Sequence, residues 1–169
     1  MPVVSNTSPL LNLAIINRLY LIHEQFGNIF IPPAVLAELR VDERLPGSKI
    51  LSDAIKSGWI QLKELKNHDM VEILYRDLDR GEAEAIVLAL ELKSKWLLLD
   101  ERDARKIGKS LGLRVTGILG ILLRAVKDQK LSSIEQVIDK LITQCGFRIS
   151  DNLKAEILAE SSKLKTPQE

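Results

Sequence analysis

Four oxygen-bearing side chains stand at points in the chain where a sheet could present them to a substrate. Asn6 and Asp100 directly follow short apolar runs, whereas Glu38 and Glu82 lie in helix-like segments that come after short strands or turns. The four are separated by 32, 44 and 18 positions. Most of the 23 Asp and Glu residues must be surface groups, but packed strand ends could bring these four side chains into one cleft.

The chemistry of such a cleft is that of a divalent cation. Carboxylates that lie close together repel one another, and a bound cation removes this repulsion. The chain has one Cys and two His, which argues against a zinc or His-rich site, and oxygen ligands suit Mg²⁺ or Mn²⁺. A cation held by Asn6, Glu38, Glu82 and Asp100 could activate water and stabilise charge on a phosphodiester during in-line displacement.

Short apolar runs alternate with helical patterns along the chain. The apolar spacing of the first helix continues from Leu10 to Ile22. The alternation predicts an α/β fold, a three-layer α/β/α sandwich with a mainly parallel central sheet. Ligands of such sheets bind at the carboxyl ends of strands, where Asn6 and Asp100 are expected. The predicted strands are residues 2–5, 29–31, 59–62, 96–99 and 113–115.

Length and composition predict one domain over residues 1–169, since 169 residues with 46% hydrophobic content can bury a sizeable core. Two helices from about residue 131 are expected to pack on it. The second of them, within residues 149–164, has the weaker apolar repeat and is typical of a capping or partner-facing helix. The apolar runs are too short for a membrane span and the start lacks a basic signal segment, so a cytosolic location is expected.

Charge is distributed unevenly although the net charge is only +1. Residues 93–130 contain ten basic and four acidic residues, a net +6 that leaves −5 for the rest of the chain. Arg102, Arg105 and Lys106 lie on the helix that Asp100 introduces and are candidate contacts for RNA phosphates. Salt bridges and a solvated helix surface explain the same residues nearly as well.

Five segments, taken in order, resemble the PIN-domain ribonucleases and, among them, the VapC-like toxin relatives. This resemblance implies a small α/β/α sandwich around a parallel sheet and cleavage of single-stranded RNA that depends on Mg²⁺ or Mn²⁺. It further implies a homodimer and an antitoxin protein that inserts near the acids. The segments are residues 3–10, 31–39, 79–86, 98–105 and 115–120.

The resemblance assigns the acids one by one. It places the second acid at Glu38, the third at Glu82 and the fourth at Asp100, with Asp103 as an auxiliary acid. Glu84 competes with Glu82 for the third place. The spacing of 18 residues to Asp100 favours Glu82, and two positions roughly 200° apart on a helix cannot both face the cleft.

The first acid is where the chain departs from the family pattern, because Asn6 stands where the pattern has Asp. An amide offers a cation one carbonyl oxygen, but it carries no charge and cannot act as a general base. Asn6 is therefore compatible with a weakened enzyme, with a catalytically impaired module that binds RNA or a regulatory partner, or with a substitution that makes a toxic protein tolerable to its expression host. A plain helix cap is a further alternative.

Two neighbouring hydroxyls have two interpretations each. Thr7 or Ser8 is similar to the hydroxyl that the family keeps beside its first acid, and either residue could equally be a helix cap.

A phosphoacceptor receiver domain would also place acids at strand ends. That class additionally needs an acidic pair near the first strand and a Lys at a late strand end, which this sequence does not place there.

Overall fold

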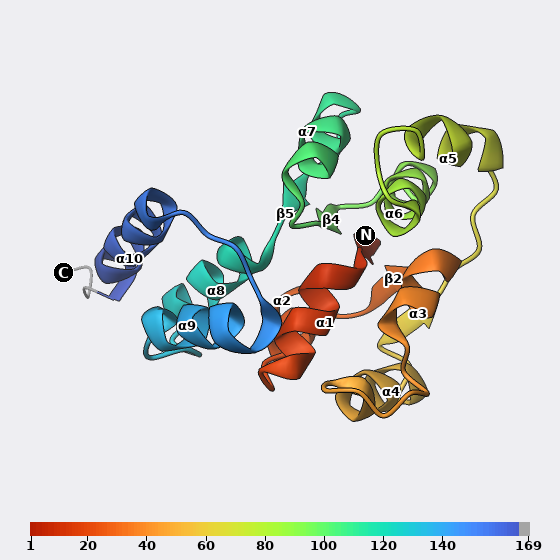
Figure 1. Cartoon of the computed structure of the whole chain (residues 1–169). Coiled ribbons are helices and arrows are strands. Elements are labelled where there is room, and N and C mark those ends of the chain that lie inside the picture. Colours follow the sequence, from red (N-terminus) through yellow and green to blue (C-terminus); the bar gives the residue numbers. More distant parts are fainter. Residues whose placement is uncertain (166–169) are drawn as a thin grey trace.

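The computed structural model describes residues 1–165 and contains a five-stranded, entirely parallel sheet in the order β3-β2-β1-β4-β5 (Figure 1). The order reverses between β1 and β4, which pair in register from Val3 opposite Trp96 to Ser5 opposite Leu98. A parallel sheet opens a crevice at such a reversal, outside the carboxyl ends of the two strands. The strands are β1 (Val3–Ser5), β2 (Ile29–Ile31), β3 (Ile60–Leu62), β4 (Trp96–Leu98) and β5 (Val115–Thr116).

Helices connect these strands and complete the described part of the chain. They are α1 (Thr7–Ile15), α2 (Tyr20–Phe26), α3 (Pro33–Leu39), α4 (Ser48–Lys56), α5 (His68–Leu74), α6 (Arg80–Glu91), α7 (Arg102–Ser110), α8 (Ile118–Lys127), α9 (Ile134–Cys145) and α10 (Asp151–Lys165).

Each face of the sheet carries its own apolar core because successive side chains of a strand point to opposite faces. Val3 and Leu98 pack with side chains of α1, α2, α4, α8, α9 and α10. Val4 and Leu97 pack on the other face with side chains of α5, α6 and α7, and Figure 1 shows α8 to α10 together on one side, away from α5 and α6. The predicted three-layer α/β/α fold with a parallel sheet is thereby confirmed.

Helix α3 has a special position because it contacts both α1 and α6, which cover opposite faces of the sheet. It follows β2 directly, so it lies at the carboxyl end of the strands. Glu38 in its last turn is consequently carried toward the crevice rather than onto a helix layer.

Two local predictions differ from the structure. The helical pattern from Leu10 to Ile22 forms two helices, α1 and α2, because the chain turns at Asn17 with a φ of 60°, a left-handed conformation that Asn tolerates better than most residues. Strand β5 also lies further along the chain than the predicted run 113–115.

The two C-terminal helices begin at Ile134 and Asp151. Helix α9 contacts α1 and α8, and α10 packs on α8, where Ile157 and Ser161 are buried. Residues 166–169, which the predicted domain includes, lie outside the described part. Within residues 1–165, no helix combines the length and the apolar character needed to cross a membrane.

Candidate active site

Asn6 and Asp100 emerge from adjacent strand ends. The backbone N–H of Asn6 donates to the Leu98 carbonyl at 2.9 Å, which continues the β1–β4 pairing by one residue. Asp100 follows Leu98 by two positions. The predicted placement of both residues at the carboxyl ends of strands is therefore what the structure has, and both stand at the reversal in strand order.

Asn6 has the backbone of a helix cap without the function of one. It occupies the N-cap position of α1 with extended dihedrals, but its side chain makes no capping hydrogen bond. The residue is only 4% exposed, and its Oδ1 is buried with no hydrogen-bond partner. Leaving a buried carbonyl oxygen unpaired costs about 1–3 kcal/mol, so a cation or a water at this point would offset a real penalty.

Asp100 is held by one carboxylate oxygen and leaves the other open. Its Oδ1 accepts from the backbone N–H of Ile118 at 2.7 Å, at the start of α8, while its Oδ2 is buried without a partner. Burial raises the pKa of the carboxyl to about 6, against the lowering effects of the Ile118 hydrogen bond and of the Arg105 charge. Asp100 thus offers one unused oxygen that a nearby positive charge would stabilise.

Gly117 and Arg105 fix the position of Asp100. A Cβ atom at Gly117 would collide with Asp100 Oδ1 and with Nη1 of Arg105, so the approach of this carboxylate requires glycine there. Nη1 of Arg105 donates to the Leu99 carbonyl at 2.9 Å. Arg105, predicted as an RNA contact, is half-buried and supports the segment that carries Asp100.

Glu38 joins three helices. The Thr7 hydroxyl at the start of α1 donates to Glu38 Oε2, and the carboxylate lies over Gly81, where an added Cβ would meet both of its oxygens. Thr7 thus bonds Glu38, which is the second acid of the expected set and not the first acidic position beside which a hydroxyl was expected. Its neighbour Ser8 is half-buried in the first turn of α1.

Glu82 belongs to a capping box at the start of α6. Asp79 Oδ1 accepts from the Glu82 backbone N–H at 2.8 Å, and Glu82 Oε2 accepts from the Asp79 backbone N–H at 3.0 Å. Glu82 is 7% exposed, and burial raises its pKa to about 7, with the charges of Asp79 and Glu101 acting in the same direction. The capping box does not use its second oxygen, Oε1.

Glu84 caps a neighbouring helix. Its Oε1 accepts from the Ala34 backbone N–H at 3.1 Å, and its Oε2 lies 3.7 Å from Nε of Arg80. The N-cap residue of α3 is Pro32, whose side chain has no acceptor, so Glu84 supplies the missing one from α6. Both carboxylate oxygens of Glu84 thus have partners, one of them at the start of α3. Glu82, two positions earlier, interacts instead with Asp79 and Glu101.

Sequence reasoning named Asp103 and missed Glu101. Asp103 is exposed in the first turn of α7. The carboxylate of Glu101 accepts from the Ala104 backbone N–H at 2.8 Å, and its charge helps to raise the pKa of Glu82. The position of Glu101 directly after Asp100 could have identified it as a further candidate acid. Arg102 and Lys106 on the same helix are exposed.

The unpartnered oxygens fit a hard divalent cation. Among residues 1–165, no three Asp, Glu, His or Cys side chains come together in an arrangement that could hold a metal ion. Mg²⁺ usually binds through one or two carboxylates and keeps several waters. One carboxylate oxygen of Asp100 and the amide oxygen of Asn6, both buried without partners, match that kind of donor set.

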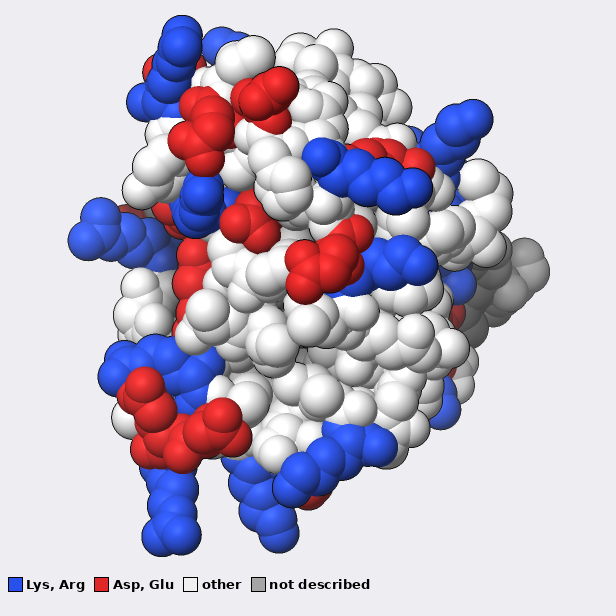
Figure 2. All heavy atoms as spheres, turned by 90° about the vertical axis from the view of Figure 1, so that its right-hand side faces the viewer, with Lys and Arg blue, Asp and Glu red and all other residues white. Residues whose placement is uncertain are grey.

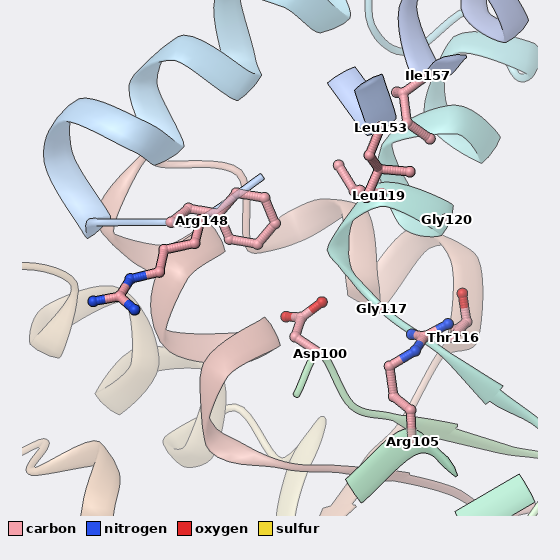
Figure 3. A pocket seen from close by; sticks show the side chains of 10 residues that line it. Asp100, Arg105, Thr116, Gly117, Leu119, Gly120, Arg148, Leu153 and Ile157 are labelled. Carbon is pink, nitrogen blue, oxygen red and sulfur yellow. The ribbon is translucent and has the colours of Figure 1, made fainter. Parts of the chain in front are cut away.

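A pocket of about 370 Å³ opens beside Asp100 (Figure 3). Leu119 of α8 and two side chains of α10, Leu153 and Ile157, form an apolar wall. Phe147 and Arg148, from the connection between α9 and α10, also line it. Sequence reasoning missed these C-terminal residues because they stand about 50 positions after Asp100 and carry no motif.

The face formed by α3, α4 and α5 has mixed charge. Figure 2 views the molecule from this side and shows Lys and Arg side chains interspersed with Asp and Glu, with uncharged surface between them. The described part of this face therefore offers no single broad patch of one sign to a polyanion.

A comparison with known protein families matches nearly the whole described chain. A family model described as a PIN domain matches residues 2–163, a range that includes all five strands, the crevice and most of α10. No curated protein matches the chain significantly. The PIN domain is a nuclease fold, and PIN nucleases generally use divalent metal ions.

Proposed function

Because the chain belongs to the PIN-domain family, we propose that it is a metal-dependent endoribonuclease that cleaves single-stranded RNA, the toxin of a toxin–antitoxin pair. The observation that carries the proposal is the pair of buried oxygens without partners, Asn6 Oδ1 and Asp100 Oδ2, at the reversal in strand order. The antitoxin partner and a homodimeric state rest on the VapC-like resemblance.

The cation, Mg²⁺ or Mn²⁺, would be held directly by Asn6 Oδ1 and Asp100 Oδ2. Glu38 and Glu82, the other two expected ligands, do not form a three-carboxylate site with Asp100 among residues 1–165, so we assign them to waters of the ion, several of which Mg²⁺ keeps. When bound, such an ion lowers the pKa of water and stabilises the charge that develops on a phosphodiester. Asn6 contributes only an uncharged carbonyl oxygen, so the negative charge of the two direct ligands comes from Asp100 alone.

Other residues of the site position the acids and accept the proton of the attacking water. Glu82 has a pKa of about 7, near the operating pH that suits a general base, and its Oε1 is available to accept a proton from the attacking water. Thr7 holds Glu38 by its hydroxyl, and Arg105 holds the segment that carries Asp100. Asp103, exposed in the first turn of α7, is the proposed auxiliary acid.

RNA phosphates would bind to α7. Arg102 and Lys106 are exposed on this helix, which begins directly after Asp100 and Glu101. Basic side chains next to the acids can position the RNA backbone without reading its sequence.

The test is cleavage of a mixed single-stranded RNA pool in Mn²⁺ by the natural chain and by its Asn6→Asp and Asp100→Asn variants. We expect cleavage by the natural chain, faster cleavage by Asn6→Asp because a charged ligand is gained, and none by Asp100→Asn. Cleavage that survives EDTA or the Asp100→Asn change would refute a metal-dependent mechanism at this site.

A second function, from a different class, is favoured by one residue. Asn6 removes a charge and a proton acceptor from the first acidic position, as expected of a catalytically impaired module that binds RNA or a regulatory partner. This alternative predicts RNA binding without cleavage, and binding that Mn²⁺ does not strengthen. Restored cleavage in Asn6→Asp, with none in the natural chain, would support it.

A further inference from the structure

The C-terminal segment supplies one wall of the pocket beside Asp100, and two helix ends fix that wall in place. Gly146 ends α9 with a φ of 66°, and the backbone N–H of Phe147 donates to the Leu141 carbonyl at 3.1 Å, a helix-ending pattern that requires a residue such as glycine at this position. The Ser150 hydroxyl then accepts from the Leu153 backbone N–H at 3.1 Å and caps α10. Phe147 is thus placed by local hydrogen bonds.

The wall is also anchored from behind. Helix α10 packs on α8, and Ile157 on its buried face is 7% exposed. In Figure 3, Leu153 and Ile157 of α10 lie close to Leu119 of α8, and Asp100 lies below them. The pocket is therefore a feature of the packed molecule, directly adjacent to the carboxylate of the candidate site.

The lining combines three kinds of side chain that an unpaired nucleotide needs. Leu119, Leu153 and Ile157 offer an apolar surface, and Phe147 is an aromatic ring of the kind on which bases of single-stranded RNA stack. Arg148 is exposed, and in Figure 3 its guanidinium points away from Asp100, where it can meet the phosphate backbone. The volume of about 370 Å³ lies in the range of small-molecule sites.

We propose that this pocket holds one unpaired base of the RNA substrate beside the phosphodiester that is cut, and that Phe147, Leu153 and Ile157 set the base preference of cleavage. The inference rests on the proposed function, since it names the part of the substrate that the same site recognises. The C-terminal segment is then part of the substrate site, in addition to its role in covering α8.

Binding is the first test, because it does not depend on catalysis. Fluorescein-labelled RNA hexamers of A, U and C, and an abasic hexamer with the same phosphates, are titrated in EDTA and followed by anisotropy. The natural chain should bind at least one base-bearing hexamer about 5-fold or more tighter than the abasic one, as expected for a stacked base. Phe147→Ala should abolish this difference, and Tyr20→Ala, which removes a 44% exposed aromatic residue from α2, should preserve it.

Filling the pocket is the second test. Leu153 is 40% exposed, so Leu153→Trp adds bulk at the pocket without burying a larger residue in the core. In a randomised RNA, the natural chain should cut preferentially next to one type of base. The Phe147→Ala and Leu153→Trp variants should lose this base preference. Thermal melting of each variant verifies that it is folded.

The outcomes separate the two proposals. If the natural chain cleaves RNA in Mn²⁺ but binds the abasic and base-bearing hexamers equally, or if the preference survives both variants, the pocket does not hold a base and the nuclease proposal stands. If the natural chain neither binds nor cleaves any of the RNAs, both proposals are overturned, and a protein side chain becomes the better occupant of the pocket.

Discussion

Replacing Asp100 by Asn should make the metal-free protein more stable while it removes metal binding. The buried Oδ2 of Asp100 has no partner, and burial raises the pKa of the carboxyl from 3.8 to about 6. An amide has nearly the same shape and keeps the Oδ1 acceptor for the Ile118 N–H, but it puts no charge into this buried position. The substitution therefore removes a destabilising ionisation.

The magnitude follows from the pKa difference. A pKa that burial raises from 3.8 to about 6 corresponds to about 3 kcal/mol, or about 6–12 °C in melting temperature for a chain of this size. Because the folded-state pKa of Asp100 is raised above its unfolded value, the native carboxylate destabilises the fold progressively as the pH rises from about 4 to about 6, and by a constant amount above that. The advantage of Asp100→Asn is therefore complete at pH 8 and disappears below about pH 4.

Urea unfolding at several pH values between 4 and 8, in EDTA, measures this difference. Asp42→Asn is the matched control, since Asp42 is exposed and its substitution should change the free energy of unfolding by less than about 0.5 kcal/mol. Adding Mn²⁺ at pH 8 should stabilise the natural chain by mass action and leave Asp100→Asn unchanged. An Asp100→Asn variant that is no more stable than the natural chain at pH 8 in EDTA would refute the reasoning.

Substitutions at three residues test other parts of the site. Gly117→Ala should lower the single-turnover cleavage rate on the order of 100-fold, because the new Cβ must displace the Asp100 carboxylate; an unchanged rate would contradict this. Glu84→Ala should cost about 1 kcal/mol in urea unfolding through loss of the cap on the Ala34 N–H, whereas Glu84→Gln, which keeps an acceptor, should cost less. Asn6→Asp should tighten Mn²⁺ binding in calorimetry and lower stability in EDTA at pH 8, since it adds a buried charge; a stabilised apo variant would count against it.

Much of the fold could be predicted because its signals are local. Short apolar strands alternate with helices, and this alternation leaves a parallel sheet with two covered faces as the consistent architecture. Strand ends follow from the same pattern, so the positions of Asn6 and Asp100 were predictable. The break between α1 and α2 was not, because Asn17 adopts a left-handed conformation inside an apolar pattern that continues on both sides.

The contacts within the candidate site depend on tertiary packing that no spacing encodes. The sequence shows a hydroxyl at Thr7, but the partner of that hydroxyl is Glu38, 31 residues later. Spacing favours Glu82 over Glu84, but the reason Glu84 is occupied is the uncapped start of α3. The pocket wall from Phe147 to Ile157 depends on how α10 docks on α8, which an amphipathic pattern alone does not specify.

The central claim is that Asn6 and Asp100 hold a divalent ion on which RNA cleavage depends. The most direct measurement is the single-turnover cleavage rate of one labelled single-stranded RNA as a function of Mn²⁺ concentration, for the natural chain and for Asn6→Asp. We predict saturable, EDTA-sensitive cleavage by both proteins, with Asn6→Asp reaching half its maximum rate at a lower Mn²⁺ concentration. Identical Mn²⁺ dependence in the two proteins, or no cleavage by either while both are folded, would contradict the claim.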